Sequence, residues 1–95
     1  MILNKIKQIE ELHRLTDDFT WKTVYKDIIN ALLYIYISTD KKLISDISYD
    51  KQRFFYYNVY MDVYKIGVDM VSPTPEQKKL IISTLESFNC ATHID

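Results

Sequence analysis

A single glycine and two prolines in 95 residues restrict this chain more than any other feature of its sequence. Strand-and-turn proteins reverse direction through glycine, Asn-Gly pairs and proline at short intervals, and this chain has almost none of them. At this length we expect one domain with one core over residues 1–95. The sequence therefore predicts an all-α fold, an antiparallel four-helix bundle with a short C-terminal tail.

Two helices are expected in the first half of the chain. Residues 3–15 repeat apolar side chains at three- or four-residue steps: Ile2, Ile6, Ile9, Leu12 and Leu15. Residues 20–38 carry a wider apolar stripe of Trp21, Val24, Tyr25, Ile28, Leu32, Ile35 and Tyr36, flanked by Ile29, Leu33 and Ile37. A helix that is apolar over so much of its circumference is expected at the centre of its bundle. Between the two helices, Asp17 and Asp18 are interpreted as a capping turn rather than as a catalytic carboxylate pair.

The third helix is expected over residues 48–70, and the sequence leaves residues 41–47 open as helical turn or loop. Its polar face comprises Lys51, Asn58, Asp62, Lys65 and Asp69, and its core face Phe54, Tyr57, Met61, Tyr64 and Val68. Because Tyr49, Phe55, Tyr56 and Tyr60 cannot all face the same core, part of this set is predicted to form an exposed aromatic patch. Gly67 marks either a close approach of two helices or fraying of the helix end.

The last helix has the best-defined start. Thr74 is placed as N-cap, Pro75 at the first helical position and Gln77 for a reciprocal capping box. The helix is expected over residues 75–89, with residues 89–95 as a short tail. Its core face carries Leu80, Ile81, Leu85 and Phe88.

The sequence contains almost no residues in the patterns that form catalytic or metal-binding sites. Twelve basic and thirteen acidic residues give a net charge of −1. The sequence therefore lacks the excess of basic residues that binding to nucleic acid or to a membrane surface requires. His13 and His93, the only histidines, lie at opposite ends of the chain without neighbours at metal-ligand spacing. Cys90 is the only cysteine, so no internal disulfide is expected. We therefore expect neither catalysis nor a metal, a cofactor or a small-molecule substrate.

A cytosolic location is expected from the same sequence. Lys5 interrupts the N-terminus before the apolar core of a signal peptide can form. The most apolar stretch, from Ile28 to Ile37, is far shorter than the roughly 20 residues that span a bilayer.

Residues 69–81, Asp-Met-Val-Ser-Pro-Thr-Pro-Glu-Gln-Lys-Lys-Leu-Ile, resemble a segment of a known family. The family is that of the immunity proteins against pediocin-like (class IIa) bacteriocins, whose last helix starts with Thr/Ser-x-x-Gln followed by Leu or Ile. The order of four helices, the short length and the content of tyrosine and lysine are also similar. The sequence departs from the family in its short tail after Phe88, which lacks the expected glycine.

The resemblance implies a cytosolic bundle that protects a bacteriocin producer by binding the complex of bacteriocin and mannose permease. It also implies that the C-terminal half decides specificity. Together with the surplus aromatics, it selects the expected partner-binding residues Tyr56, Tyr60, Phe88, Asn89, Thr92, His93 and Ile94. The alternatives are a small phage- or virus-encoded inhibitor of a host protein, and an adaptor whose aromatic face is buried in a dimer. The cognate partner and the oligomeric state remain open at this point.

Overall fold

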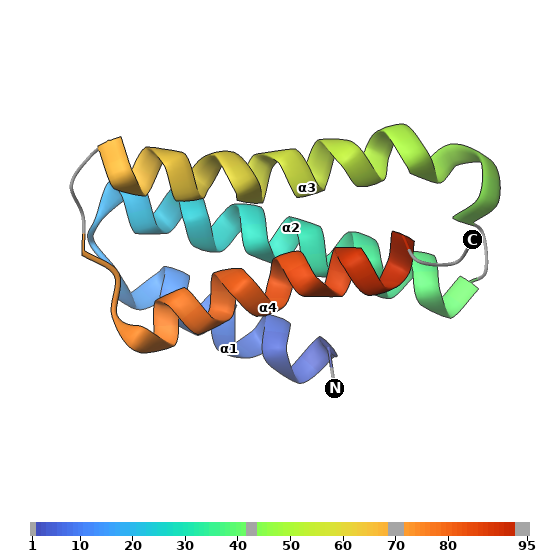
Figure 1. The fold of residues 1–95 in the computed structure, drawn as a ribbon. Helices are drawn as coiled ribbons and strands as arrows, with labels where there is room; N and C mark the ends of the chain where they lie inside the picture. The colour runs from blue at the N-terminus through green and yellow to red at the C-terminus, as the bar shows by residue number, and fades with distance from the viewer. Residues whose placement is uncertain (1, 42–43, 69–71, 93–95) are drawn as a thin grey trace.

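The computed structural model of this chain is built from helices joined by short connections (Figure 1). It describes the backbone of residues 2–41, 44–68 and 72–92, and the side chains of residues 2–36, 53–68 and 72–87. These residues form four helices and no strand: α1 (Ile2–Leu15), α2 (Phe19–Lys41), α3 (Ile44–Val68) and α4 (Pro75–Thr92). Successive helices run in alternate directions along the long axis (Figure 1). The all-α class expected from the scarcity of helix breakers is confirmed.

Helix α2 lies at the centre of the molecule and supplies most of its core. It packs against α1, α3 and α4, and its buried apolar residues are Trp21, Val24, Tyr25, Ile28, Ala31, Leu32 and Ile35. The other helices add Ile6, Ile9, Val59, Ile66 and Ile81 to the same cluster. The central position predicted from the wide apolar stripe of this helix is therefore confirmed.

Helix α1 buries only the first part of its predicted stripe. Ile6 and Ile9 are buried, whereas Leu12 and Leu15 are exposed. The helix packs on α2, and its link to α4 is polar: Lys5 Nζ donates a hydrogen bond to Ser83 Oγ at 2.9 Å. The apolar stripe of α1 is therefore buried at Ile6 and Ile9 and exposed at its C-terminal end.

Polar side chains determine where α2 and α4 begin. Asp18 Oδ1 accepts hydrogen bonds from the backbone N–H of Thr20 at 2.9 Å and of Trp21 at 3.4 Å. This confirms the capping role expected there. At the start of α4, Thr74 N donates to Gln77 Oε1 at 2.9 Å and Gln77 N donates to Thr74 Oγ1 at 3.1 Å. The predicted capping box is therefore present, and Gln77 Nε2 also donates to Tyr25 Oη on α2 at 2.9 Å.

Replacing Thr74 by alanine tests this capping box. The variant Thr74→Ala leaves the N–H of Gln77 without its side-chain acceptor, and we expect the free energy of unfolding to fall by about 1 kcal/mol. Urea denaturation followed by circular dichroism measures the difference. Thr74→Ser keeps the hydroxyl and should retain most of the stability, whereas an unchanged Thr74→Ala midpoint would contradict the role.

Several helix boundaries differ from those expected. Helix α2 continues to Lys41 and α3 already begins at Ile44, so the described part of residues 41–47 is helical. The described part of α3 ends at Val68, and the expected end at residue 70 lies outside the described residues, whereas α4 continues to Thr92, so residues 89–92 are helix rather than tail. A side chain built on Gly67 would meet nothing within 4 Å, which excludes the close helix approach as the reason for this glycine.

Candidate functional site

Helix α3 packs on the core through a side that includes Asp62 of the face expected to be polar, whereas Lys65 of that face is exposed. Val59, Asp62 and Ile66 are buried, and Phe55 and Tyr56 are partly buried against the core. The Phe55 ring lies 5.0 Å from that of Tyr34 on α2, measured between ring centroids. The core face predicted from sequence is exposed instead, so that assignment is wrong. Both faces of α3 carry apolar side chains, and the one with the compact Val59 and Ile66 packs against the bundle.

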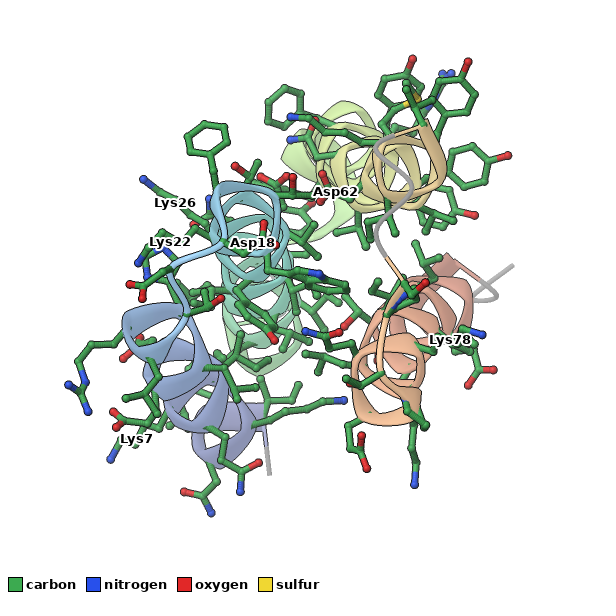
Figure 2. All side chains as sticks on the ribbon, turned by 90° about the vertical axis from the view of Figure 1, so that its left-hand side faces the viewer. Lys7, Asp18, Lys22, Lys26, Asp62 and Lys78 are labelled. Carbon is green, nitrogen blue, oxygen red and sulfur yellow. The ribbon has the colours of Figure 1, made fainter. Side chains whose placement is uncertain are left out.

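The other face of α3 forms a line of large apolar side chains without a facing helix among the described residues. We call this line the exposed apolar face of α3: Phe54, Tyr57, Met61, Tyr64 and Val68. Its exposed fractions range from 38% at Met61 to 67% at Tyr64, and Tyr60 and Val63 flank it as further exposed residues. Figure 2 shows aromatic rings extending from α3 away from the other helices. Steps of three and four residues are those of a heptad seam, in which one helix packs along another.

The residues predicted to bind a partner fall into two groups. Tyr60 is exposed as expected, while Tyr56 is partly buried against the core and stacks on Tyr60 with ring centroids 6.2 Å apart. The side chains of Phe88, Asn89 and Thr92 lie outside the described ones, and His93 and Ile94 lie outside the described residues altogether. Of the predicted set, the structure brings together the two tyrosines, at the edge of the exposed apolar face.

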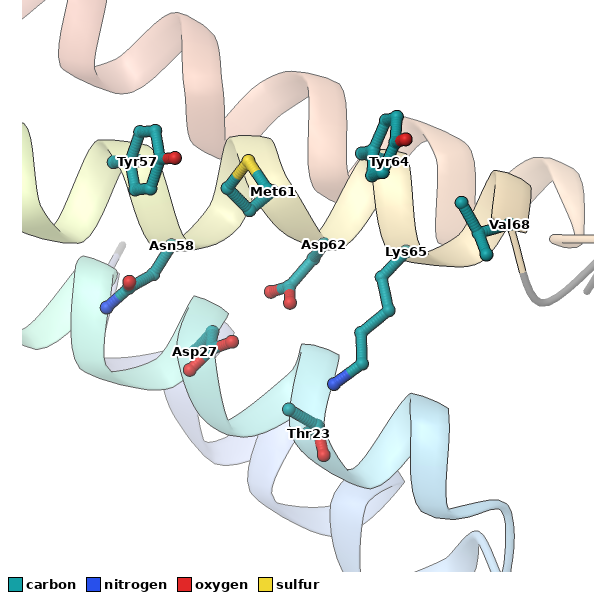
Figure 3. Close-up of a pocket in the computed structure, with 9 residues that line it drawn as sticks. All are labelled: Thr23, Asp27, Tyr57, Asn58, Met61, Asp62, Tyr64, Lys65 and Val68. Carbon is teal, nitrogen blue, oxygen red and sulfur yellow. The ribbon is translucent and has the colours of Figure 1, made fainter.

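Beside this face, two carboxyl groups meet between α2 and α3. Asp62 extends from α3 toward Asp27 on α2, and the Lys65 side chain reaches toward Thr23 (Figure 3). They lie along an open hollow of about 440 Å³, lined by Thr23, Asp27, Tyr57, Asn58, Met61, Asp62, Tyr64, Lys65 and Val68. The hollow therefore joins the carboxyl pair to the exposed apolar face, because four of its lining residues belong to that face.

The environment of Asp62 favours its protonated form. Asp62 is 4% exposed. The pKa of its carboxyl is raised to about 8, chiefly by burial and also by a hydrogen bond with Asp27 and the negative charge of Asp27. The positive charge of Lys65 acts in the opposite direction and lowers this pKa. A hydrogen bond between two carboxyl groups requires that they share a proton. Asp62 Oδ2 is nevertheless buried without a hydrogen-bond partner. No ion pair joins Lys65 to either carboxyl in the described part of the chain.

The Asp27 and Asp62 carboxyl groups can bind a positively charged group. No group of three or more His, Cys, Asp or Glu side chains that could hold a metal ion occurs among the described residues. Two carboxyls with one proton carry a single negative charge, and the free oxygen can accept a hydrogen bond from a donor that enters the hollow. The arrangement fits a lysine or arginine side chain better than it fits a neutral group.

Asp27 and the burial of Asp62 were missed in the sequence. Asp62 falls on the helical face with Asn58 and Lys65, which together indicate solvent. The sequence of α2 could have indicated this contact. This helix is expected at the centre of the bundle, and Asp27 is the only acidic residue between Asp18 and Asp40. A lone carboxylate in such a helix predicts a polar contact with a neighbouring helix.

The comparisons with known proteins identify no relative. No protein-family model, no curated protein and no solved structure matches the chain. None of the helices built by the described residues combines the length and the apolar character that crossing a bilayer requires. Function has to be inferred from the faces and the charges of the helices themselves.

Proposed function

We propose that this chain is a binding protein of the bacteriocin-immunity type, which holds a protein partner on the exposed apolar face of α3. The observation that supports it is this face itself, five large apolar side chains in one line on the side of α3 opposite to the core. Large contiguous apolar patches on a monomer usually mark interaction sites. Aromatic residues and methionine are also enriched at such sites.

The bacteriocin part of the proposal draws on the resemblance at residues 69–81. In this chain Thr74 and Gln77 have a structural role, because they form the capping box and anchor α4 to Tyr25. The resemblance therefore supports the proposal less than the exposed face does. In the proposed role the chain acts from the cytosolic side on the complex of bacteriocin and mannose permease, and its own chemistry is binding alone.

Expression in a bacteriocin-sensitive strain tests the proposed function. We expect reduced killing by at least one class IIa bacteriocin, and we expect the double variant Tyr57→Ala/Tyr64→Ala to abolish this protection. The physical reason is the loss of two large rings from the middle of the contact, where truncation of a single anchor costs about 2 kcal/mol or more. The measurement is the bacteriocin concentration that halves growth.

The matched control is Leu15→Ala/Phe19→Ala, which removes two exposed apolar side chains elsewhere on the surface. It should protect like the unchanged chain, and circular dichroism should show both double variants folded. Full protection by Tyr57→Ala/Tyr64→Ala would show that the α3 face is not the binding surface. Protection from no class IIa bacteriocin would refute immunity, and inhibition of a host protein would then become the leading proposal.

A further inference from the structure

We propose that the partner of the exposed apolar face is a helix that carries a lysine or arginine, whose charged group enters the hollow beside Asp27 and Asp62. This inference rests on the proposed function, since it assumes that the face binds a protein. It adds the secondary structure of the partner and the charge that the partner must present.

The spacing of the exposed residues indicates a helix as the occupant. Phe54, Tyr57, Met61, Tyr64 and Val68 follow one another at steps of three, four, three and four residues, which are the a and d positions of consecutive heptads. A helix laid along this line contacts every one of them. An extended strand has a period of two and finds no partner hydrogen bonds on a helix surface, because the backbone groups of α3 are already paired within the helix.

The carboxyl pair indicates the charge of the occupant. Asp62 Oδ2 is buried without a hydrogen-bond partner, which native structures rarely leave unexplained. The hollow that contains it is also lined by Tyr57, Met61 and Tyr64 of the exposed apolar face. A basic side chain at the edge of a docked helix can therefore lay its aliphatic stem along this lining and place its charge at the carboxyls. The cation can then donate a hydrogen bond to Asp62 Oδ2 and offset the single negative charge that the two carboxyls carry.

A second copy of this chain complements the surface less well. An isologous dimer through α3 brings the same patch of both copies together, and it places two carboxyl pairs and two Lys65 side chains at one interface. Such a dimer adds no cation beyond the Lys65 that already lines each hollow. A helix with a basic residue satisfies the apolar line and the carboxyl pair at the same time.

The test is a displayed library of helical peptides with randomised a, d and flanking positions, selected against the full chain. The same library is selected in parallel against Asp62→Asn, which keeps the size of the side chain and replaces the carboxyl, which can ionise, by an amide, which cannot. We expect apolar residues at a and d with both proteins, and a stronger enrichment of lysine or arginine at one flanking position with the unchanged chain. Binding of an enriched peptide should weaken about ten- to hundredfold in Asp62→Asn. Asp27→Asn provides a second variant in case Asp62→Asn folds poorly.

Each other outcome has a distinct meaning. Enriched peptides without a basic residue, or with equal affinity for both Asp variants and the unchanged chain, would overturn the inference while leaving the apolar face as a docking surface. Absence of any enriched peptide would overturn the docking face as well. A dimer in sedimentation that Tyr57→Ala/Tyr64→Ala dissolves would overturn the inference by assigning the face to a second copy. The bacteriocin assay stands apart, so immunity can fail while the cationic helix is confirmed.

Discussion

The variant Asp62→Asn is expected to be more stable than the unchanged chain at pH 9 and to lose most of the fall in stability between pH 5 and pH 9. The pKa of the Asp62 carboxyl is raised from 3.8 to about 8, chiefly by burial. The folded chain therefore holds a proton that the unfolded chain releases. Its contribution is fully present below 3.8 and is lost as the pH rises to about 8, with a slope of up to about 1.4 kcal/mol per pH unit. Asparagine cannot ionise, so this loss disappears.

Thermal unfolding followed by circular dichroism at a series of pH values measures this effect. The groups that face Asp62 are Asp27 from α2, Lys65 from its own helix and the tyrosines 57 and 64 that line the hollow. Asp27→Asn removes the neighbouring charge but not the burial, so its profile should lie between those of the other two proteins. Glu10→Gln, at an exposed position of α1, should run parallel to the unchanged chain. An Asp62→Asn profile that also runs parallel would disprove the buried pair.

Helix α2 and the start of α4 show how much of this fold was predictable from sequence. The apolar residues of α2 cover so much of its circumference that only a central position buries them. Thr74, Pro75 and Gln77 define a helix start through contacts within a few residues. Both features can be predicted from the sequence, because neither depends on knowing which face of one helix packs against which face of another.

The orientation of α3 shows what was not predictable. Two faces of this helix are apolar, and the choice between them depends on which set of side chains fits against α2. The Val59 and Ile66 side chains, with Phe55 beside Tyr34, fill that space better than a row of tyrosines. The free-energy cost of burying the Asp62 carboxyl favours the opposite orientation of α3. Asp27 reduces this cost, because the two carboxyls share a proton.

The carboxyl pair was only partly predictable for the same reason, because Asp27 indicates a polar contact with a neighbouring helix but does not identify its partner. Asp27 and Asp62 belong to different helices, and their meeting depends on the register between α2 and α3. No pattern within either helix specifies that register. The predicted partner-binding residues were affected as well, because Tyr56 was placed on the exposed surface and the structure has it partly buried against the core.

The largest loss of stability from a single truncation is expected at the centre of α2. Ile28 is fully buried, with an exposed fraction of 0%, in the helix that packs against all three others. Ile28→Ala removes three carbon atoms from this position and leaves a cavity that rigid neighbouring helices cannot close. We expect the free energy of unfolding to fall by about 2–5 kcal/mol. For a chain of this size the melting temperature should fall by roughly 10 °C or more.

Ile82→Ala is the matched control, because it makes the same chemical change in a helix at a position that is 54% exposed. It should cost less than about 1 kcal/mol, since the lost side chain was already half in water. Urea denaturation of both variants gives the comparison. If α2 is the central helix, the loss in Ile28→Ala must exceed that in Ile82→Ala several-fold. Equal losses would mean that the packing of Ile28 among the four helices is not what stabilises the fold.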